Sequence, residues 1–137
     1  MSSEQSSQFI AIVDDDTSVQ TALQDLIESE GLSTLCFSSA EEFLDSGAHH
    51  KAGCLIADIR MPGMSGLELQ AKLIAERCRI RIIFITAHGD AKMRIQAMRD
   101  GAVEFLTKPF DNAVLVETVR AAVEDYAKAL GLWNSNQ

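Results

Sequence analysis

Short apolar runs alternate along this chain with longer stretches in which apolar residues recur every three or four positions. The short runs predict buried or half-buried β-strands, over residues 9–13, 33–37, 54–58, 81–86 and 102–106. The longer stretches predict amphipathic helices, over residues 17–29, 39–47, 67–76, 90–99 and 112–130. Each strand is therefore expected to be followed by a helix.

Local signals support several of these boundaries. Asp16 is expected to cap the helix at 17–29, and Gly31 to end it. Ser39 and Glu42 have the spacing of a capping box. The run at 33–37 is more polar than the others, which favours an edge strand.

Five successive strand–helix units predict an α/β fold, a doubly wound parallel sheet of five strands with helices on both faces. The 137 residues are enough for one domain with its own core. We assign that domain to residues 8–130, with tails at 1–7 and 131–137.

Composition narrows the classes of function. The net charge of −8 argues against direct nucleic acid binding by this chain. The three cysteines are far apart and match no zinc or disulfide pattern. No signal peptide or apolar run of eighteen residues is present in the sequence, so we expect no membrane association and a cytoplasmic location.

Polar residues with related chemistry stand where the predicted strands end. These are Asp14 and Asp15, Asp58, Thr86 and Lys108. The carboxyl ends of parallel strands meet at one edge of a sheet, where function collects in such folds. Clustered carboxylates favour a hard cation such as Mg²⁺. Together with a lysine and a hydroxyl, they predict a site for a phosphoryl group.

Four motifs carry a resemblance to a known family. "VDDD", "ADIRMPGMSG", "ITAHGD" and "EFLTKPF" occur in the order and spacing of the receiver domain of bacterial two-component response regulators. The resemblance covers about residues 8–127 and is strongest to FixJ-type receivers. It implies a flavodoxin-like fold with strand order 2-1-3-4-5.

The resemblance also implies roles for individual residues. Asp58 would accept a phosphoryl group from a phosphohistidine of a histidine kinase. Asp15, Asp58 and the backbone carbonyl of Arg60 would bind Mg²⁺ directly, and Asp14 would hold a metal-bound water. Lys108 would pair with the phosphate. No enzymatic activity is expected beyond the chain's own phosphorylation and dephosphorylation.

The same resemblance implies a conformational switch. Thr86 would donate a hydrogen bond to the phosphate, and Phe105 would turn inward behind it, although Phe105 alone reads as a half-buried strand residue. The face formed by residues 90–99, 102–106 and 112–130 would then support a homodimer or bind a partner. The Lys108–Pro109 bond is expected to be cis, at the modest cost that X-Pro bonds permit.

Several hypotheses for the output of such a switch are compatible with the sequence. No DNA-binding helix-turn-helix follows residue 130, so control of transcription would need an output domain outside this chain. A stand-alone regulator or phosphorelay protein, and a receiver that acts without phosphorylation, are alternatives. The kinase, its signal and the target genes are not encoded in recognisable form.

An enzymatic function is a further hypothesis. "DDDTS" after a buried strand is close to the opening motif of haloacid-dehalogenase-like phosphatases, with Asp14 as nucleophile and Asp16 as acid and base. The chain is short for that family's cap, and the reading leaves "DIRMPGMSG" unexplained. His49, His50 and His88 are expected to be surface residues.

Overall fold

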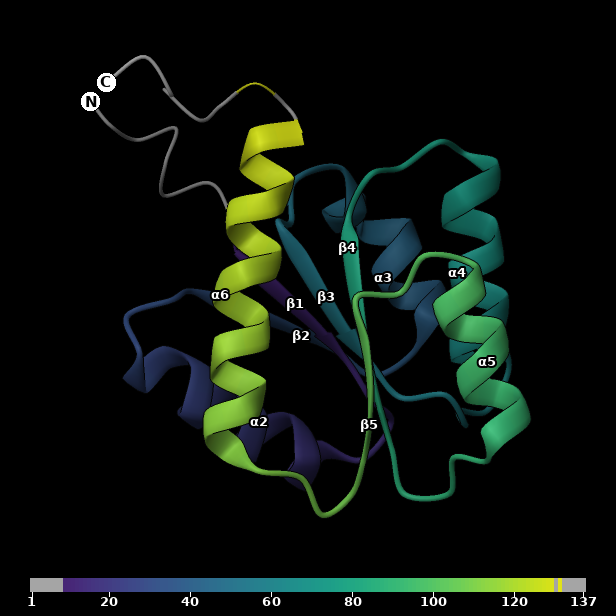
Figure 1. Cartoon of the computed structure of the whole chain (residues 1–137), viewed down its shortest axis with the longest axis horizontal. Helices are drawn as coiled ribbons and strands as arrows, with labels where there is room; N and C mark the ends of the chain where they lie inside the picture. Colours follow the sequence, from purple (N-terminus) through teal and green to yellow (C-terminus); the bar gives the residue numbers. More distant parts are fainter. Residues whose placement is uncertain (1–8, 130, 132–137) are drawn as a thin grey trace.

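The computed structural model describes residues 9–129 and 131, and its centre is a parallel sheet (Figure 1). Its five strands lie in the order β2-β1-β3-β4-β5, which confirms the expected order. Their bounds are β1 Ile10–Val13, β2 Thr34–Phe37, β3 Cys54–Ala57, β4 Arg81–Thr86 and β5 Glu104–Thr107.

Helices follow the strands as expected, within the described residues. They are α2 Thr17–Ser29, α3 Ala40–Ser46, α4 Gly66–Ala75, α5 Ala91–Arg99 and α6 Asn112–Ala129. A short 3₁₀ helix, η1 Ala48–His50, was not predicted. The part of the chain that the structure describes contains no helix with the length and apolarity to cross a membrane.

Two apolar layers join the helices to the sheet. Leu23 and Ile27 of α2 pack with Leu115 and Val119 of α6 on one face. The other face carries residues of α3, α4 and α5, among them Phe43 and Leu69. Every residue of β1 and β3 is buried, as expected for central strands, whereas β2 is an edge strand with Leu35 about half exposed.

Helix starts agree with the sequence in part. Asp16 caps α2 by accepting hydrogen bonds from the backbone N–H groups of Ser18 and Val19. Ser39 caps α3, but the predicted capping box is wrong, because the Glu42 carboxylate accepts from the N–H of Ser38 instead. The reciprocal box occurs in α4, where Ser65 and Glu68 satisfy each other's backbone N–H groups.

Two other expectations need correction, and two more concern residues outside the described part of the chain. The last strand starts at Glu104, two residues later than predicted, because Val103 makes only a single backbone bond to Ile82. His49 is buried, since η1 turns it toward Phe43. The predicted tails lie outside the described residues except for residue 131, and so does the expected end of the last helix at residue 130.

Candidate functional site

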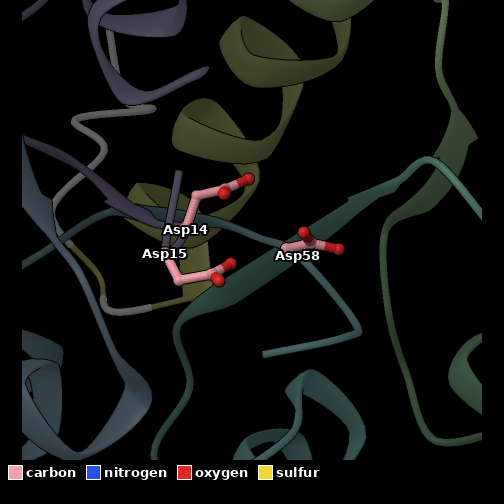
Figure 2. Close-up of side chains that lie close together, drawn as sticks. All are labelled: Asp14, Asp15 and Asp58. Atoms are coloured by element: carbon pink, nitrogen blue, oxygen red, sulfur yellow. The ribbon is translucent and has the colours of Figure 1, made fainter. Parts of the chain in front are cut away.

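Three aspartates from two neighbouring strands lie together at the carboxyl end of the sheet (Figure 2). Val13 and Ala57 are partners in the ladder between β1 and β3, so the residues that follow them emerge side by side. Each of Asp14, Asp15 and Asp58 offers a carboxylate oxygen within 4.8 Å of those of the other two. The structure therefore brings together the acids that the sequence placed at strand ends.

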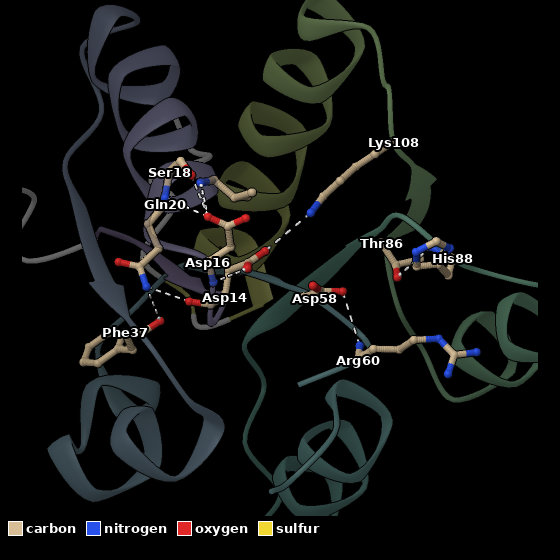
Figure 3. Close-up of polar contacts among 11 residues, drawn as sticks. Asp14, Asp16, Ser18, Gln20, Phe37, Asp58, Arg60, Thr86, His88 and Lys108 are labelled. Carbon is tan, nitrogen blue, oxygen red and sulfur yellow. Dashed lines mark hydrogen bonds and ion pairs between the residues drawn. The ribbon is translucent and has the colours of Figure 1, made fainter. Parts of the chain in front are cut away.

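Asp14 is the buried member of this group, with 3% of its surface exposed. Its carboxylate accepts a hydrogen bond of 2.9 Å from the N–H of Asp16 and lies 3.7 Å from the ammonium of Lys108 (Figure 3). Burial raises the pKa of Asp14, and the charge of Asp58 adds to this, while the Asp16 hydrogen bond and Lys108 oppose it. A cation at this site would therefore favour the ionised form.

Asp58 is held by the loop that follows it. The N–H of Arg60 donates to the Asp58 carboxylate at 3.3 Å, while the Arg60 side chain extends away (Figure 3). Gly66, the first residue of α4, lies so close that a Cβ there would be 2.4 Å from the carbonyl oxygen of Asp58. A residue without a side chain is thus required where the loop returns to the strand.

Thr86 ends β4 near these acids and is 1% exposed. Its hydroxyl oxygen is 3.4 Å from the backbone nitrogen of His88, which donates to it. His88 itself is exposed, as expected. Lys108 follows β5, and its peptide bond to Pro109 is cis.

Phe105 is 2% exposed, so the prediction that it is a half-buried strand residue is wrong. Its ring centroid lies 6.3 Å from that of Phe84, its ladder partner in β4. Arg94 of α5 covers the ring, with its guanidinium carbon 5.9 Å from the ring centroid, and donates to the Phe105 carbonyl at 2.8 Å. The side chain therefore already occupies an inward position.

Sequence reasoning missed two polar residues that contact the edges of this site. Gln20 of α2 donates to the carbonyl of Asp14, and Glu41 of α3 accepts from the N–H of Met64. Neither belongs to a motif, and the spacing along the chain gives no sign of either contact. Gly89 lies within the motif "ITAHGD", but its close approach to Phe105 and Thr86 was not predicted from the sequence.

The donor set suits a hard cation. Carboxylate oxygens, one of them buried, are the ligands that Mg²⁺ uses when it keeps several waters. A nearby ammonium and a buried hydroxyl supply groups that favour phosphoryl oxygens. The arrangement can therefore neutralise a phosphoryl group beside a carboxylate that is accessible to solvent.

Comparisons with known proteins agree with this arrangement. The response regulator receiver domain family matches residues 10–120. The chain is 43% identical to the transcriptional regulatory protein FixJ of Azorhizobium caulinodans, over 83% of this chain and 54% of that protein. It is 49% identical to the response regulator protein TodT of Pseudomonas putida, over 84% and 51%. This chain thus spans about half the length of these curated relatives.

Solved structures give the same result. The response regulator StyR superimposes with a TM-score of 0.85 and 42% identity, covering 91% of this chain and 63% of that one. FixJ-N superimposes with a TM-score of 0.77 and 37% identity, covering 85% and 94%. The sheet and its surrounding helices are therefore shared with these proteins.

Proposed function

This chain belongs to the family of response regulator receiver domains of two-component systems, and on that premise we propose that its Asp58 accepts a phosphoryl group from a phosphohistidine of a histidine kinase. The observation that supports this most is the approach of three carboxylates from β1 and β3 to within 4.8 Å, beside Lys108. Among them Asp58 is partly exposed, and within the described residues its carboxylate accepts a single hydrogen bond, of 3.3 Å from the N–H of Arg60, so a carboxylate oxygen is accessible to a phosphodonor.

Mg²⁺ is the cofactor that we propose for this site. Asp15, Asp58 and the backbone carbonyl of Arg60 would hold it directly, and Asp14 would hold one of its waters. When bound, the ion neutralises the carboxylates and the oxygens of the phosphoryl group. Burial and, to a smaller extent, the charge of Asp58 raise the pKa of Asp14, and both effects support a need for such a cation.

The proposed transfer is a displacement at phosphorus. A carboxylate oxygen of Asp58 forms a bond to phosphorus as the phosphorus–nitrogen bond to histidine breaks, and the imidazole nitrogen keeps the electron pair. Lys108 balances the charge that the phosphoryl oxygens bring to the site. Thr86 then turns its hydroxyl from the loop toward a phosphoryl oxygen. The only other reaction proposed is hydrolysis of the acyl phosphate, in which water attacks phosphorus and releases inorganic phosphate and the free Asp58 carboxylate.

The phosphatase reading is disfavoured by the role of Asp16. Its carboxylate accepts hydrogen bonds from the N–H and hydroxyl of Ser18 and from the N–H of Val19, and these lower its pKa. A general acid needs a raised pKa and a free carboxyl group. Asp16 is instead occupied in capping α2.

The output that we propose is a homodimer through α5, β5 and α6. Helix α5 exposes Ile95 and Met98 between the basic residues Lys92 and Arg99. Helix α6 exposes the acidic Glu117 and Glu124. This pairing of an apolar centre with opposite charges suits a modest and reversible interface. Partner binding, as in a stand-alone regulator or a phosphorelay, is the alternative outcome.

Control of transcription is proposed by analogy with FixJ, whose name describes such a protein. It would require a segment beyond the part that is similar here. The free thiols of Cys36, Cys54 and Cys78 support a reducing, cytoplasmic setting.

Phosphorylation with acetyl phosphate and Mg²⁺, followed by peptide mass spectrometry, tests the proposal. We expect one base-labile phosphate on Asp58 that is absent from Asp58→Asn and present on Asp14→Asn at a reduced level. A phosphate on Asp14 or on a histidine would overturn the proposal in favour of different chemistry.

A further inference from the structure

We infer that Gln20 and Glu41 are positioning residues that fix the distance between the two halves of the acidic site, through the segment of residues 38–42. This inference rests on the proposed function, because it concerns the Mg²⁺ affinity of that site. Neither residue contributes to the cluster of metal-binding oxygens. Their contribution is a set of hydrogen bonds that runs around the outside of the cluster.

Gln20 holds the β1 half. Its side-chain nitrogen lies 2.6 Å from the carbonyl oxygen of Asp14 and 3.3 Å from that of Phe37 (Figure 3). The same nitrogen lies 3.2 Å from the hydroxyl oxygen of Ser38. One amide group therefore joins α2 to the ends of β1 and β2. The backbone that presents Asp14 and Asp15 is tied to the start of the 38–42 segment.

Hydrogen bonds within the segment of residues 38–42 hold it in place. The N–H of Ser38 donates to the Glu42 carboxylate at 2.7 Å, and the Ser39 hydroxyl accepts from the N–H of Glu42 at 3.0 Å. These bonds fix the first turn of α3 against the end of β2. Glu41 lies in this turn, so its position follows from that of the strand.

Glu41 holds the β3 half. Its carboxylate accepts a hydrogen bond of 2.9 Å from the N–H of Met64, in the loop that follows Asp58. Gly63 makes this approach close, since a Cβ there would lie 2.7 Å from the same Glu41 oxygen. Within the described residues, no other hydrogen bond joins positions 61–65 to an element outside the loop and α4.

These hydrogen bonds matter because the two halves of the acidic site carry negative charges that repel each other. Asp14 and Asp15 lie on the β1 half and Asp58 on the β3 half, and each offers a carboxylate oxygen within 4.8 Å of those of the other two. Without an outer tie, the loop carrying Arg60 and Met64 is free to relax away from β1. Removing hydrogen-bond partners outside a metal's direct ligands typically lowers affinity by about 10- to 100-fold.

The test compares variants of Glu41 with a matched control on the same helix. Glu41→Ala removes the acceptor and the charge, and Glu41→Gln keeps an acceptor oxygen without the charge. Asp45→Ala removes an exposed carboxylate from α3 that makes no hydrogen bond or ion pair with another described residue. We expect Glu41→Ala to weaken Mg²⁺ binding about tenfold, with both other variants within twofold of the wild type.

Mg²⁺ affinity is read from amide chemical shifts during titration, and hydrogen exchange of the Met64 amide reports on the tie itself. Exchange should accelerate in Glu41→Ala alone. Gln20→Ala tests the β1 half in the same way, with Gln24→Ala, one turn along α2, as its control. Urea unfolding verifies that each variant is folded at the titration temperature.

The outcomes separate the inference from the proposed function. If wild-type protein binds Mg²⁺ and is phosphorylated on Asp58, but Glu41→Ala and Gln20→Ala bind Mg²⁺ as tightly as their controls, the inference alone is wrong. Equal weakening in Glu41→Ala and Glu41→Gln would show a charge effect and would also overturn it. Failure of the wild type to bind Mg²⁺ would contradict both the proposed function and this inference.

Discussion

Gly89 lies against the ring of Phe105 so closely that a Cβ at Gly89 would be 2.6 Å from the ring carbon Cε1. The same Cβ would lie 2.7 Å from the methyl group of Thr86. Thr86 and Phe105, to which the resemblance to receiver domains assigns the conformational switch, therefore both contact this glycine. Because Phe105 is buried here, this space is available to the ring only while position 89 carries no side chain.

The variant Gly89→Ala is expected to displace Phe105 from its buried position. Overpacking of this kind costs about 1–3 kcal/mol of stability, measurable by urea unfolding. Fluorine NMR with labelled phenylalanine should show a more solvent-exposed ring. Adding Phe105→Leu, which shortens the side chain, should recover part of the lost stability, and strictly additive effects would contradict the contact.

Lys108→Ala should separate phosphate acceptance from output. Lys108 pairs with Asp14 rather than holding Asp58, so Asp58 keeps its position and its nucleophilic oxygen. We expect the variant to acquire phosphate from acetyl phosphate more slowly and to remain monomeric in sedimentation after beryllofluoride is added. A beryllofluoride-dependent dimer as strong as that of the wild type would argue against a signalling role for Lys108.

Asp15→Asn is expected to stabilise the metal-free protein and to weaken its response to Mg²⁺. Asp15 is exposed and close to Asp14 and Asp58, so its charge is repelled by both, though water screens the effect. The gain should be roughly 0.5–1 kcal/mol in the free energy of unfolding without metal. Thermal unfolding with and without Mg²⁺ measures both effects, and a larger Mg²⁺ response in the variant would disprove the assignment.

His49 should make stability fall as the pH is lowered. Burial lowers the pKa of His49, and its buried Nδ1 atom has no hydrogen-bond partner among the described residues, while Nε2 lies 3.5 Å from Glu76. The unfolded chain binds a proton near pH 6.5, where the folded chain does not, so stability is lost from about pH 7 down to the folded pKa.

His49→Phe removes this titration and should flatten the fall of the urea midpoint as the pH is lowered below about 7. Its ring can pack against Phe43, which lies 5.7 Å from the His49 ring. His88→Gln, which changes an exposed histidine in another loop, tests whether loss of any histidine has the same effect. An unchanged slope in His49→Phe would assign the pH dependence to other groups.

The sheet and the cluster of three aspartates could be predicted because each follows from short-range patterns. Buried parallel strands have continuous apolar sequences, and the acids directly follow two of these strands. The register between β1 and β3 is therefore enough to bring Asp14 beside Asp58. The same reasoning placed the start of β5 two residues early, because Ala102 and Val103 are apolar without belonging to the ladder. Apolar character reports burial and not strand pairing.

Contacts between separate elements could not be predicted in this way. Glu41 and Met64 are 23 positions apart, and nothing in either residue's neighbours indicates that they meet. The burial of Phe105 depends on Gly89 and on Arg94, whose guanidinium covers the ring. Such positions depend on how helices pack on the sheet, which periodicity does not encode.

Helix α6 has a consequence for how a phosphate at Asp58 could be sensed at a distance. The helix begins four residues after Lys108 and runs for 18 residues, a length of about 27 Å. That is roughly three times the screening length of about 8 Å in physiological salt. The electrostatic effect of the added phosphate on a segment at the far end of α6 would therefore be almost fully screened. Information could reach it only as a mechanical change in packing or as a change in the number of chains assembled.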